Sequence, residues 1–292
     1  MKPNLRRAAL LSIATVLSTT LSHAQLIDSY NADSLSLGTV TSWTDETGTE
    51  NATASSATVG GPSGPYTLNS SGDPTAANSN SAFNGHAYVN FGAASGLVTT
   101  GSLFSGGADR SVAAVYTTPT SNTAVNPIAG EVGPGTPGEW FMLQARTSPA
   151  GSPYLAGFAD DNSGNGAPPV ANQLTFALAT YDGTTDTETV YWAYGLFGAV
   201  QSASTTASPA LNTSASPFDI GFDSSEPSVG DMQVGQVLVY ENALSSTAAA
   251  DEIGYLQDYY GAPEPSTNAL VGISLLVGVV FLRRRAQANF TA

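Results

Sequence analysis

The stretch Val234-Gly235-Gln236-Val237-Leu238-Val239-Tyr240-Glu241-Asn242-Ala243-Leu244-Ser245 decides the fold of this chain. Its valines and tyrosine predict a strand over Gly235–Tyr240. An alanine-rich run follows, and Ser245 or Ser246 can cap a helix there by accepting a hydrogen bond from an amide of the first turn. Gly261 can end that helix in a left-handed conformation. The stretch therefore predicts a strand that leads directly into one helix.

The predicted helix has one apolar face, on which Ile253, Leu256 and Tyr260 recur, so we expect it to pack onto a sheet. Upstream, short runs rich in Val, Tyr, Phe and Thr alternate with clusters of Gly, Pro, Asn, Asp and Ser. This pattern is typical of an all-β sandwich. The further candidate strands are Ala87–Phe91, Ser111–Thr117, Glu139–Arg146, Tyr154–Ala159, Leu174–Tyr181, Thr187–Tyr194 and Phe218–Phe222.

One candidate strand carries large side chains on both faces. Val190, Trp192 and Tyr194 alternate with Tyr191 and Ala193. Such a strand is either covered on both faces or lies beside a groove, and the pattern favours a core strand.

Three segments resemble a known family. The opening stretch with its helix resembles the last strand and closing helix of laminin-G-like, concanavalin-A-like jelly rolls. Leu174–Gly183 resembles the family's strand and tight turn, and Ser42–Gly48 resembles its Trp-x-Asp-x-x-Gly loop. The resemblance implies one all-β jelly-roll sandwich over residues 25–262. Residues 51–84 fit it less well, and we expect an inserted Ser- and Gly-rich loop there.

The charge of the chain is unevenly distributed. Of the 8 Lys and Arg residues, only Arg110 and Arg146 lie between residues 25 and 262. The same segment holds all 23 acidic residues except Glu264, so its formal charge is 2 minus 22, or −20. This excludes nucleic-acid binding, which needs clustered cations. With no cysteine, the fold has no disulfides and depends on its apolar core.

The N-terminus has the three parts of a secretory signal peptide. Lys2, Arg6 and Arg7 precede an apolar stretch, and Ser22-His23-Ala24 forms a small-x-small site. We expect residues 1–24 to be removed by cleavage between Ala24 and Gln25. A retained anchor helix is the alternative.

The C-terminus, residues 263–292, is also tripartite. Pro263-Glu264-Pro265 precedes the apolar run 269–282 and the cluster Arg283-Arg284-Arg285. These parts resemble the PEP-CTERM sorting signal of Gram-negative bacteria. The resemblance implies that an exosortase-type membrane transpeptidase acts at Pro263, Glu264 and Pro265 and transfers the protein to the cell surface or matrix.

The physical properties of the tail fit that reading. The 14 residues of the apolar run span about 21 Å as a helix, less than a hydrocarbon core of about 30 Å. Such a marginal span suits transient insertion, and the arginines would stay cytoplasmic. A permanent C-terminal anchor would have the same topology and stays open.

No catalytic pattern stands out in the middle of the chain. Glycoside hydrolysis needs two carboxylates that face the sugar. Asp182, Asp186 and Glu188 come nearest, but they surround a turn, where acidic residues are common. His86 has no Gly-x-Ser-x-Gly motif nearby, so we expect it to have no catalytic role.

Ligand binding has two candidates. Calcium would suit the oxygen-rich loops, since it prefers carboxylate and amide oxygens. The weak calcium candidates are Asp160, Asp161, Asn162, Asp223 and Asp231. Carbohydrate binding could use Trp43, Trp140 or Trp192, although aromatic residues of a sandwich are more often in the core.

The sequence thus predicts an exported, non-enzymatic surface or matrix protein with a carbohydrate- or adhesion-type module and no required cofactor. Extracellular polysaccharide is its expected partner. The alternatives are an extracellular glycoside hydrolase or lyase on the same fold, and a structural module without a small ligand.

Overall fold

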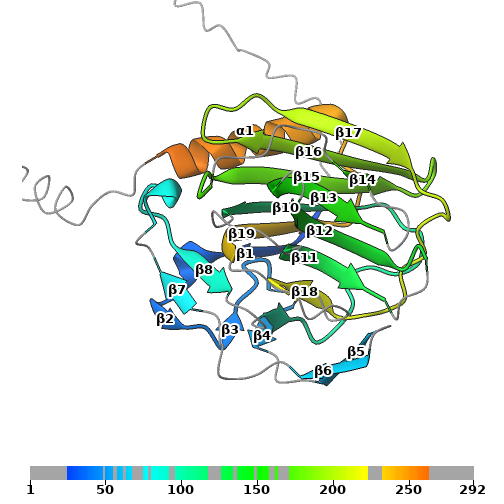
Figure 1. Cartoon of the computed structure of the whole chain (residues 1–292), viewed down its shortest axis with the longest axis horizontal. Helices are drawn as coiled ribbons and strands as arrows, with labels where there is room; N and C mark the ends of the chain where they lie inside the picture. The colour runs from blue at the N-terminus through cyan, green and yellow to red at the C-terminus, as the bar shows by residue number, and fades with distance from the viewer. Residues whose placement is uncertain are drawn as a thin grey trace, which may run out of the picture.

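Two antiparallel sheets lie face to face in the computed structural model (Figure 1). The structure describes residues 25–48, 50–54, 58–61, 64–67, 75–77, 80–91, 96–117, 126–133, 137–147, 150–157, 162–163, 171–222 and 232–262. The predicted signal peptide and sorting tail lie outside the described residues, as do Asp160, Asp161, Asp223 and Asp231.

The helix-side sheet has nine strands in the order β17-β16-β15-β10-β19-β8-β7-β2, with β1 also paired to β19. Its strands are β1 (Leu26–Asn31), β2 (Gly38–Thr39), β7 (Thr75–Ala77), β8 (Tyr88–Phe91), β10 (Arg110–Thr117), β15 (Thr175–Asp182), β16 (Thr187–Tyr194), β17 (Gln201–Thr206) and β19 (Met232–Tyr240).

The second sheet has eight strands in the order β14-β13-β12-β11-β18-β9-β4-β3. They are β3 (Ser42–Trp43), β4 (Ala52–Ala54), β9 (Leu97–Val98), β11 (Asn126–Val132), β12 (Trp140–Thr147), β13 (Ala150–Ala156), β14 (Asn162–Ser163) and β18 (Phe218–Ile220). A separate hairpin joins β5 (Thr58–Gly61) to β6 (Gly64–Thr67). The 3-10 helices are η1 (Ala32–Ser34) and η3 (Ser81–Phe83).

The strand rich in large side chains is a core strand, as predicted. Val190 and Trp192 of β16 belong to the apolar cluster between the sheets. Tyr191 and Ala193 point the other way, into a second cluster under the helix. Because both faces of β16 are covered, its continuous run of bulky residues needs no exposed groove to explain it.

The helix α1 (Ser246–Gly261) covers the outward face of the helix-side sheet (Figure 1). Its cap is Ser245, whose side chain accepts a hydrogen bond from the Ala248 amide. Ile253, Leu256 and Tyr260 are buried, which confirms the predicted apolar face. Within the described ranges, no helix is both long and apolar enough to span a membrane.

The predicted left-handed stop at Gly261 is wrong. Gly261 is the last helical residue and is not among the glycines with positive φ, and Ala262 continues in an extended conformation. The carbonyls at this helix end accept hydrogen bonds from side chains of Asn84 and His86 instead. A left-handed glycine is therefore not needed to satisfy them.

The Trp-x-Asp-x-x-Gly segment organises a turn beside the sheet. Trp43 is fully buried and packs edge-on against Tyr30. One carboxylate oxygen of Asp45 accepts hydrogen bonds from the amides of Ser29 (2.7 Å) and Thr47 (2.9 Å). Trp43 is thus a core residue, and it is not available for stacking on a sugar.

The region 51–84, where an inserted Ser- and Gly-rich loop is expected, contains the short elements β4, β5, β6, β7 and η3. These strands are only three or four residues long. Such short strands, composed mainly of Thr, Ala and Gly, carry almost none of the alternating apolar pattern that marks a strand in a sequence.

Candidate functional site

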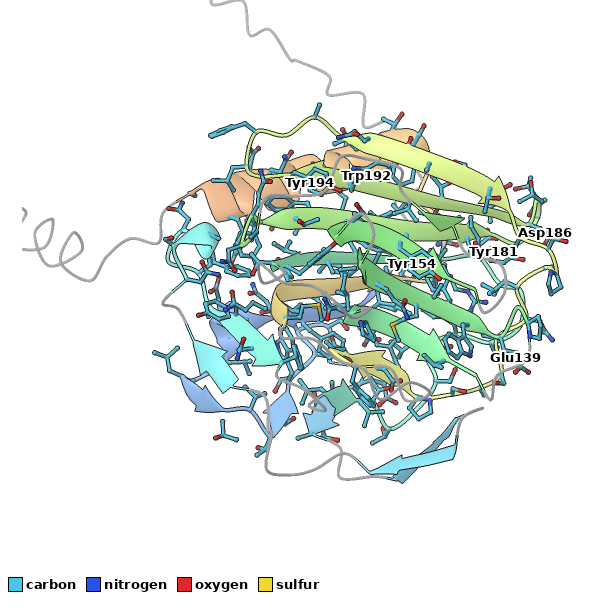
Figure 2. The ribbon with its side chains drawn as sticks, in the orientation of Figure 1. Glu139, Tyr154, Tyr181, Asp186, Trp192 and Tyr194 are labelled. Atoms are coloured by element: carbon cyan, nitrogen blue, oxygen red, sulfur yellow. The ribbon has the colours of Figure 1, made fainter. Side chains whose placement is uncertain are left out.

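The acidic residues at the β15–β16 turn form hydrogen bonds within or beside the turn. Asp182 Oδ1 accepts hydrogen bonds from the amides of Thr184 (2.8 Å) and Thr185 (3.3 Å), and the bond from Thr184 is the main cause that lowers the pKa of Asp182. Asp186 Oδ1 accepts a 2.7 Å hydrogen bond from the Tyr181 hydroxyl. Figure 2 shows Tyr181 and Asp186 at the end of the sandwich where this turn lies.

Glu188, the third acid of the group, is buried on β16 in register with Tyr181. Each carboxylate therefore has a different environment: a turn cap, a tyrosine partner and a buried strand position. Paired catalytic carboxylates would instead face a common substrate position.

An unpredicted pair of ionisable residues lies inside the sandwich near that turn. Arg110 is fully buried and donates to the carbonyls of Ala108 (2.9 Å) and Gly106 (2.5 Å) and to Thr213 Oγ1 (2.6 Å). Burial lowers the pKa of Arg110 to about 10, an effect that the charge of Glu131 opposes.

Glu131 is fully buried on β11. Its Oε1 accepts hydrogen bonds from the amides of Leu103 (2.6 Å) and Phe104 (2.8 Å) and from the Ser102 hydroxyl (3.0 Å). Burial outweighs these bonds and raises the pKa of Glu131 to about 7. Sequence reasoning missed this pair, and the only signal was that Arg110 is one of two cations in the middle of the chain.

The margin where β13 and β16 approach each other has the side chains best suited to bind a ligand. Trp192 Nε1, the Tyr194 hydroxyl and the Ser152 hydroxyl are buried atoms that make no hydrogen bond of normal geometry. Ser152 lies close enough to Tyr194 to lower the pKa of that phenol, although burial raises it overall. Trp192 and Tyr194 lie side by side on β16 in Figure 2.

This margin reaches the protein surface. Tyr194 is half-buried, and Gln201 of the edge strand β17 is exposed and in register with Trp192. An indole, a phenol, an aliphatic hydroxyl and an amide are the groups that bind neutral sugars, because they combine an apolar surface with hydrogen-bonding atoms. We name Ser152, Trp192, Tyr194 and Gln201 the margin cluster.

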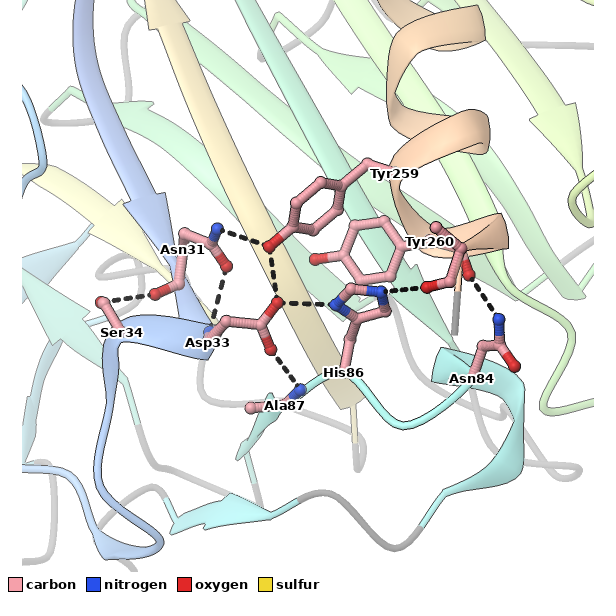
Figure 3. A network of polar contacts seen from close by, with 9 residues as sticks. Asn31, Asp33, Ser34, Asn84, His86, Ala87, Tyr259 and Tyr260 are labelled. Carbon is pink, nitrogen blue, oxygen red and sulfur yellow. Dashed lines mark hydrogen bonds and ion pairs between the residues drawn. The ribbon is translucent and has the colours of Figure 1, made fainter. Parts of the chain in front are cut away.

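His86 is engaged at both ring nitrogens. Nδ1 lies 2.7 Å from Asp33 Oδ2, and Nε2 lies 3.0 Å from the carbonyl oxygen of Ala262. The ring is only 5% exposed. Both ring nitrogens thus have partners within the protein (Figure 3).

The other predicted ligand residues are dispersed. Trp140 lies in a cluster with Met142 and Tyr154 that is separate from the core between the sheets, and its indole nitrogen donates to the Gly133 carbonyl (3.1 Å). Asn162 contributes backbone to β14. Among the described residues, no group of three or more His, Cys, Asp or Glu side chains could hold a metal ion.

Neither a protein-family model nor a curated protein sequence matches this chain. Solved structures do. Domain 4 of an extracellular arabinanase from Geobacillus stearothermophilus, in complex with arabinotriose, is 19% identical with a TM-score of 0.52, and the match covers 78% of this chain and 98% of that domain.

Two further glycosidase structures are similar. A Trypanosoma rangeli sialidase is 15% identical with a TM-score of 0.50, over 80% of this chain and 33% of that one. An α-L-arabinofuranosidase is 13% identical with a TM-score of 0.52, over 76% of this chain and 50% of that one. This chain thus spans about a third of the sialidase. At these identities the likeness shows the fold, a β-sandwich.

These comparisons overturn the main functional expectation. The sequence predicted a non-enzymatic surface or matrix protein, whereas the similar structures belong to a sialidase, an arabinanase and an arabinofuranosidase. The alternative of an extracellular glycoside hydrolase or lyase is favoured instead. The sequence alone favours the non-enzymatic interpretation because no pair of carboxylates stands out in the middle of the chain.

Proposed function

We propose that this chain is an extracellular carbohydrate-active protein of the glycoside hydrolase or lyase class, built on a laminin-G-like, concanavalin-A-like jelly roll that binds an oligosaccharide. The observation that carries the proposal is the match along 98% of an arabinanase domain bound to arabinotriose. The formal charge of −20 between residues 25 and 262 also favours a neutral polysaccharide over an acidic one, because like charges repel.

The margin cluster is the proposed place of binding. Ser152 is 1% and Trp192 is 3% exposed, so their polar atoms are shielded from water. Neither makes a hydrogen bond of normal geometry, although Ser152 lies close to the Tyr194 hydroxyl. Leaving such an atom unpaired costs about 1–3 kcal/mol. A sugar hydroxyl that reaches the half-buried Tyr194 hydroxyl would recover part of that cost. The indole of Trp192 lies in the core between the sheets, so it does not stack on the sugar.

The first test is sugar release. The purified protein is incubated with a panel of polysaccharides that includes arabinan and sialylated glycans, and new reducing ends or unsaturated products are measured together with binding by calorimetry. We expect binding and product release with at least one substrate. If no polysaccharide is bound or cleaved, the proposed function is wrong.

The second test locates the site. Tyr194→Phe and Ser152→Ala each remove one oxygen atom and little volume, and we expect each to weaken oligosaccharide binding about tenfold. Tyr255→Phe, at an exposed position of α1, is the matched control and should bind as the wild type does. Unchanged binding in both variants would reject the margin cluster while leaving the function intact.

We also propose that the protein is exported by its signal peptide and sorted through its PEP-CTERM tail to the cell surface or matrix of a Gram-negative bacterium. An exosortase-type membrane transpeptidase is the proposed partner. The support is the order and spacing of the basic, apolar and Pro-Glu-Pro segments. Intact-mass analysis of protein from its own host should find residues 1–24 and the arginine cluster absent, and their retention would reject this proposal.

A further inference from the structure

The loop between β16 and β17 carries an exposed phenylalanine. It comprises residues 195–200 and joins Tyr194, at the end of β16, to Gln201, at the start of β17. Phe197 in this loop is 97% exposed. Burial of such a large apolar side chain would stabilise the fold, and Phe197 forgoes that stabilisation. Tyr194 and Gln201 belong to the margin cluster, so Phe197 lies on the segment that joins two of its members.

This loop is anchored at several points. The Gly195 amide donates to the Leu174 carbonyl at 2.7 Å. The Gly198 amide donates to the Gly195 carbonyl at 3.3 Å, which closes a tight turn that contains Phe197. The side-chain amide of Gln257 on α1 donates to the carbonyls of Gly195 and Gly198, each at 3.0 Å. Figure 1 shows the loop beside α1, and the exposed phenylalanine thus belongs to a turn that the helix holds.

The neighbours of Phe197 fill the apolar positions under the helix. Leu196 and Val200 pack against the cluster between α1 and the helix-side sheet. A Cβ at Gly198 would lie 2.3 Å from the Tyr194 carbonyl oxygen, so only glycine fits there. Turns usually carry Gly, Pro, Asn, Asp or Ser, each for its backbone properties. Neither the turn nor the core therefore accounts for a phenylalanine at this position.

The surroundings of Phe197 favour a small ligand over a protein partner. The other exposed large apolar side chains among the described residues are Leu26, Leu37 and Tyr255. Leu37 precedes β2, which lies at the opposite edge of the helix-side sheet from β17. Tyr255 pairs with the ring of Tyr259 on α1. A stable protein interface buries about 800 Å² on each partner, and one phenylalanine does not supply its apolar centre.

The charge of the domain and the chemistry of the ring favour a neutral sugar. The formal charge of −20 between residues 25 and 262 repels anionic lipid headgroups. The face of an aromatic ring is weakly negative, so it attracts the weakly positive C–H groups of a sugar ring. The indole of Trp192 is buried in the core. The margin cluster therefore offers hydrogen-bonding groups but no open aromatic face, and Phe197 supplies one.

We propose that one sugar ring of a neutral oligosaccharide stacks on Phe197, and that Gln257 is the residue that positions Phe197 for this contact. The inference rests on the function proposed above and adds the chemical class of the ligand, a neutral sugar with an open C–H face. The exposed amide of Gln201 binds hydroxyls at the edge of the same sugar. Because the turn is anchored before the sugar arrives, binding loses little conformational entropy.

The test measures the binding of arabinotriose and of the panel polysaccharides to the full chain in detergent by calorimetry. Phe197→Ala removes the ring, and we expect about tenfold weaker binding. Phe197→Leu keeps an apolar side chain without an aromatic face and should be weakened as well, whereas Phe197→Tyr should bind as the wild type does. Leu37→Ala removes another exposed apolar side chain, at the opposite edge of the sheet, and is the control with unchanged binding.

Phe197→Trp gives a second, spectroscopic readout. The native residues Trp43, Trp140 and Trp192 are at most 4% exposed, so acrylamide quenches mainly the indole introduced at position 197. A stacked sugar covers one of the two ring faces, and we expect saturating ligand to lower this quenching about twofold. Unchanged quenching while the ligand is bound would show that no sugar stacks there.

The possible failures are distinguishable. If the wild type and Phe197→Ala bind a saccharide with equal affinity, the inference about Phe197 is wrong and the proposed function stands. If the wild type neither binds nor cleaves any polysaccharide, both are wrong. Size-exclusion chromatography adds a third outcome. If Phe197→Ala separates a dimer into monomers without a change in sugar affinity, Phe197 is a contact between copies of the chain, and the inference is overturned.

Discussion

The guanidinium carbon of Arg110 lies 5.0 Å from the centre of the Phe104 ring, inside the sandwich. It also lies 5.7 Å from Phe141 and 5.9 Å from Tyr181. Among the described residues no carboxylate is within salt-bridge distance of it. This buried cation is therefore held by aromatic rings, carbonyl oxygens and one hydroxyl.

Replacing Arg110 should lower the stability of the folded protein. Arg110→Met keeps much of the volume but removes the donors to the Ala108 carbonyl and the Thr213 hydroxyl. It also removes one of the donors to the Gly106 carbonyl. We expect the free energy of unfolding to fall by about 2–4 kcal/mol. Urea denaturation measures it, and a Met variant as stable as the wild type would show that these bonds contribute little.

Glu131 predicts a pH dependence of stability. Its pKa is raised from 4.5 to about 7, so the folded chain binds this proton more tightly than the unfolded chain does. The resulting stabilisation is complete below pH 4.5 and is lost as the pH rises towards 7. Its size is on the order of 3 kcal/mol.

Glu131→Gln should reduce the loss of stability between pH 4.5 and about 7. The amide can keep one oxygen at the position of Oε1 but carries no charge at high pH. Denaturation midpoints between pH 4.5 and 8 measure the slope. Glu241→Gln, at an exposed position, is the control and should keep the wild-type slope. A Glu131→Gln variant with the same slope would assign the dependence to other groups.

Two glycine substitutions should change the stability of the protein in opposite directions. A Cβ at Gly235 would lie 2.5 Å from the Tyr260 hydroxyl and 2.9 Å from the Phe83 ring, so Gly235→Ala should displace the helix and cost about 1–3 kcal/mol. Gly254 in α1 has nothing within 4 Å of such an atom. Gly254→Ala should therefore raise stability by about 0.5–1 kcal/mol. Thermal unfolding of both variants checks the pair.

Removing the helix cap should have a smaller effect on stability. Ser245→Ala removes the side chain that accepts from the Ala248 amide, and we expect a loss of about 1 kcal/mol. Ser245→Asp restores an acceptor and should recover most of it. A loss that Asp does not restore would mean that the cap has another role.

The sequence predicted those elements whose local pattern and packing agree. The strand at Thr187–Tyr194 has the predicted bounds, and α1 begins after its predicted cap. The strand β17, in contrast, reads Gln201-Ser202-Ala203-Ser204-Thr205-Thr206 and is largely exposed. It forms because β16 offers a free edge, and a polar edge strand leaves no apolar periodicity to detect.

The candidate site could be predicted only in part. Trp192 was a candidate from its residue type, but Ser152 had no distinguishing neighbour in the sequence. The two come together because β13 and β16 belong to different sheets whose margins approach. Contacts between sheets depend on topology, and no spacing within either strand encodes them. The contact between Asp33 and His86 joins residues 53 positions apart for the same reason.

The strand β19 lies at the centre of the helix-side sheet, although it is the last strand among the described residues. One side of it pairs with β10, and the other is shared by β1, along residues 236–240, and β8, along residues 232–234. The first and last strands are thus neighbours, and the middle of the sheet is missing until residues 232–240 have been synthesised. Contacts so distant in sequence form slowly. The folding of this sheet therefore has to wait for nearly the whole domain, because its central strand comes last among the described strands.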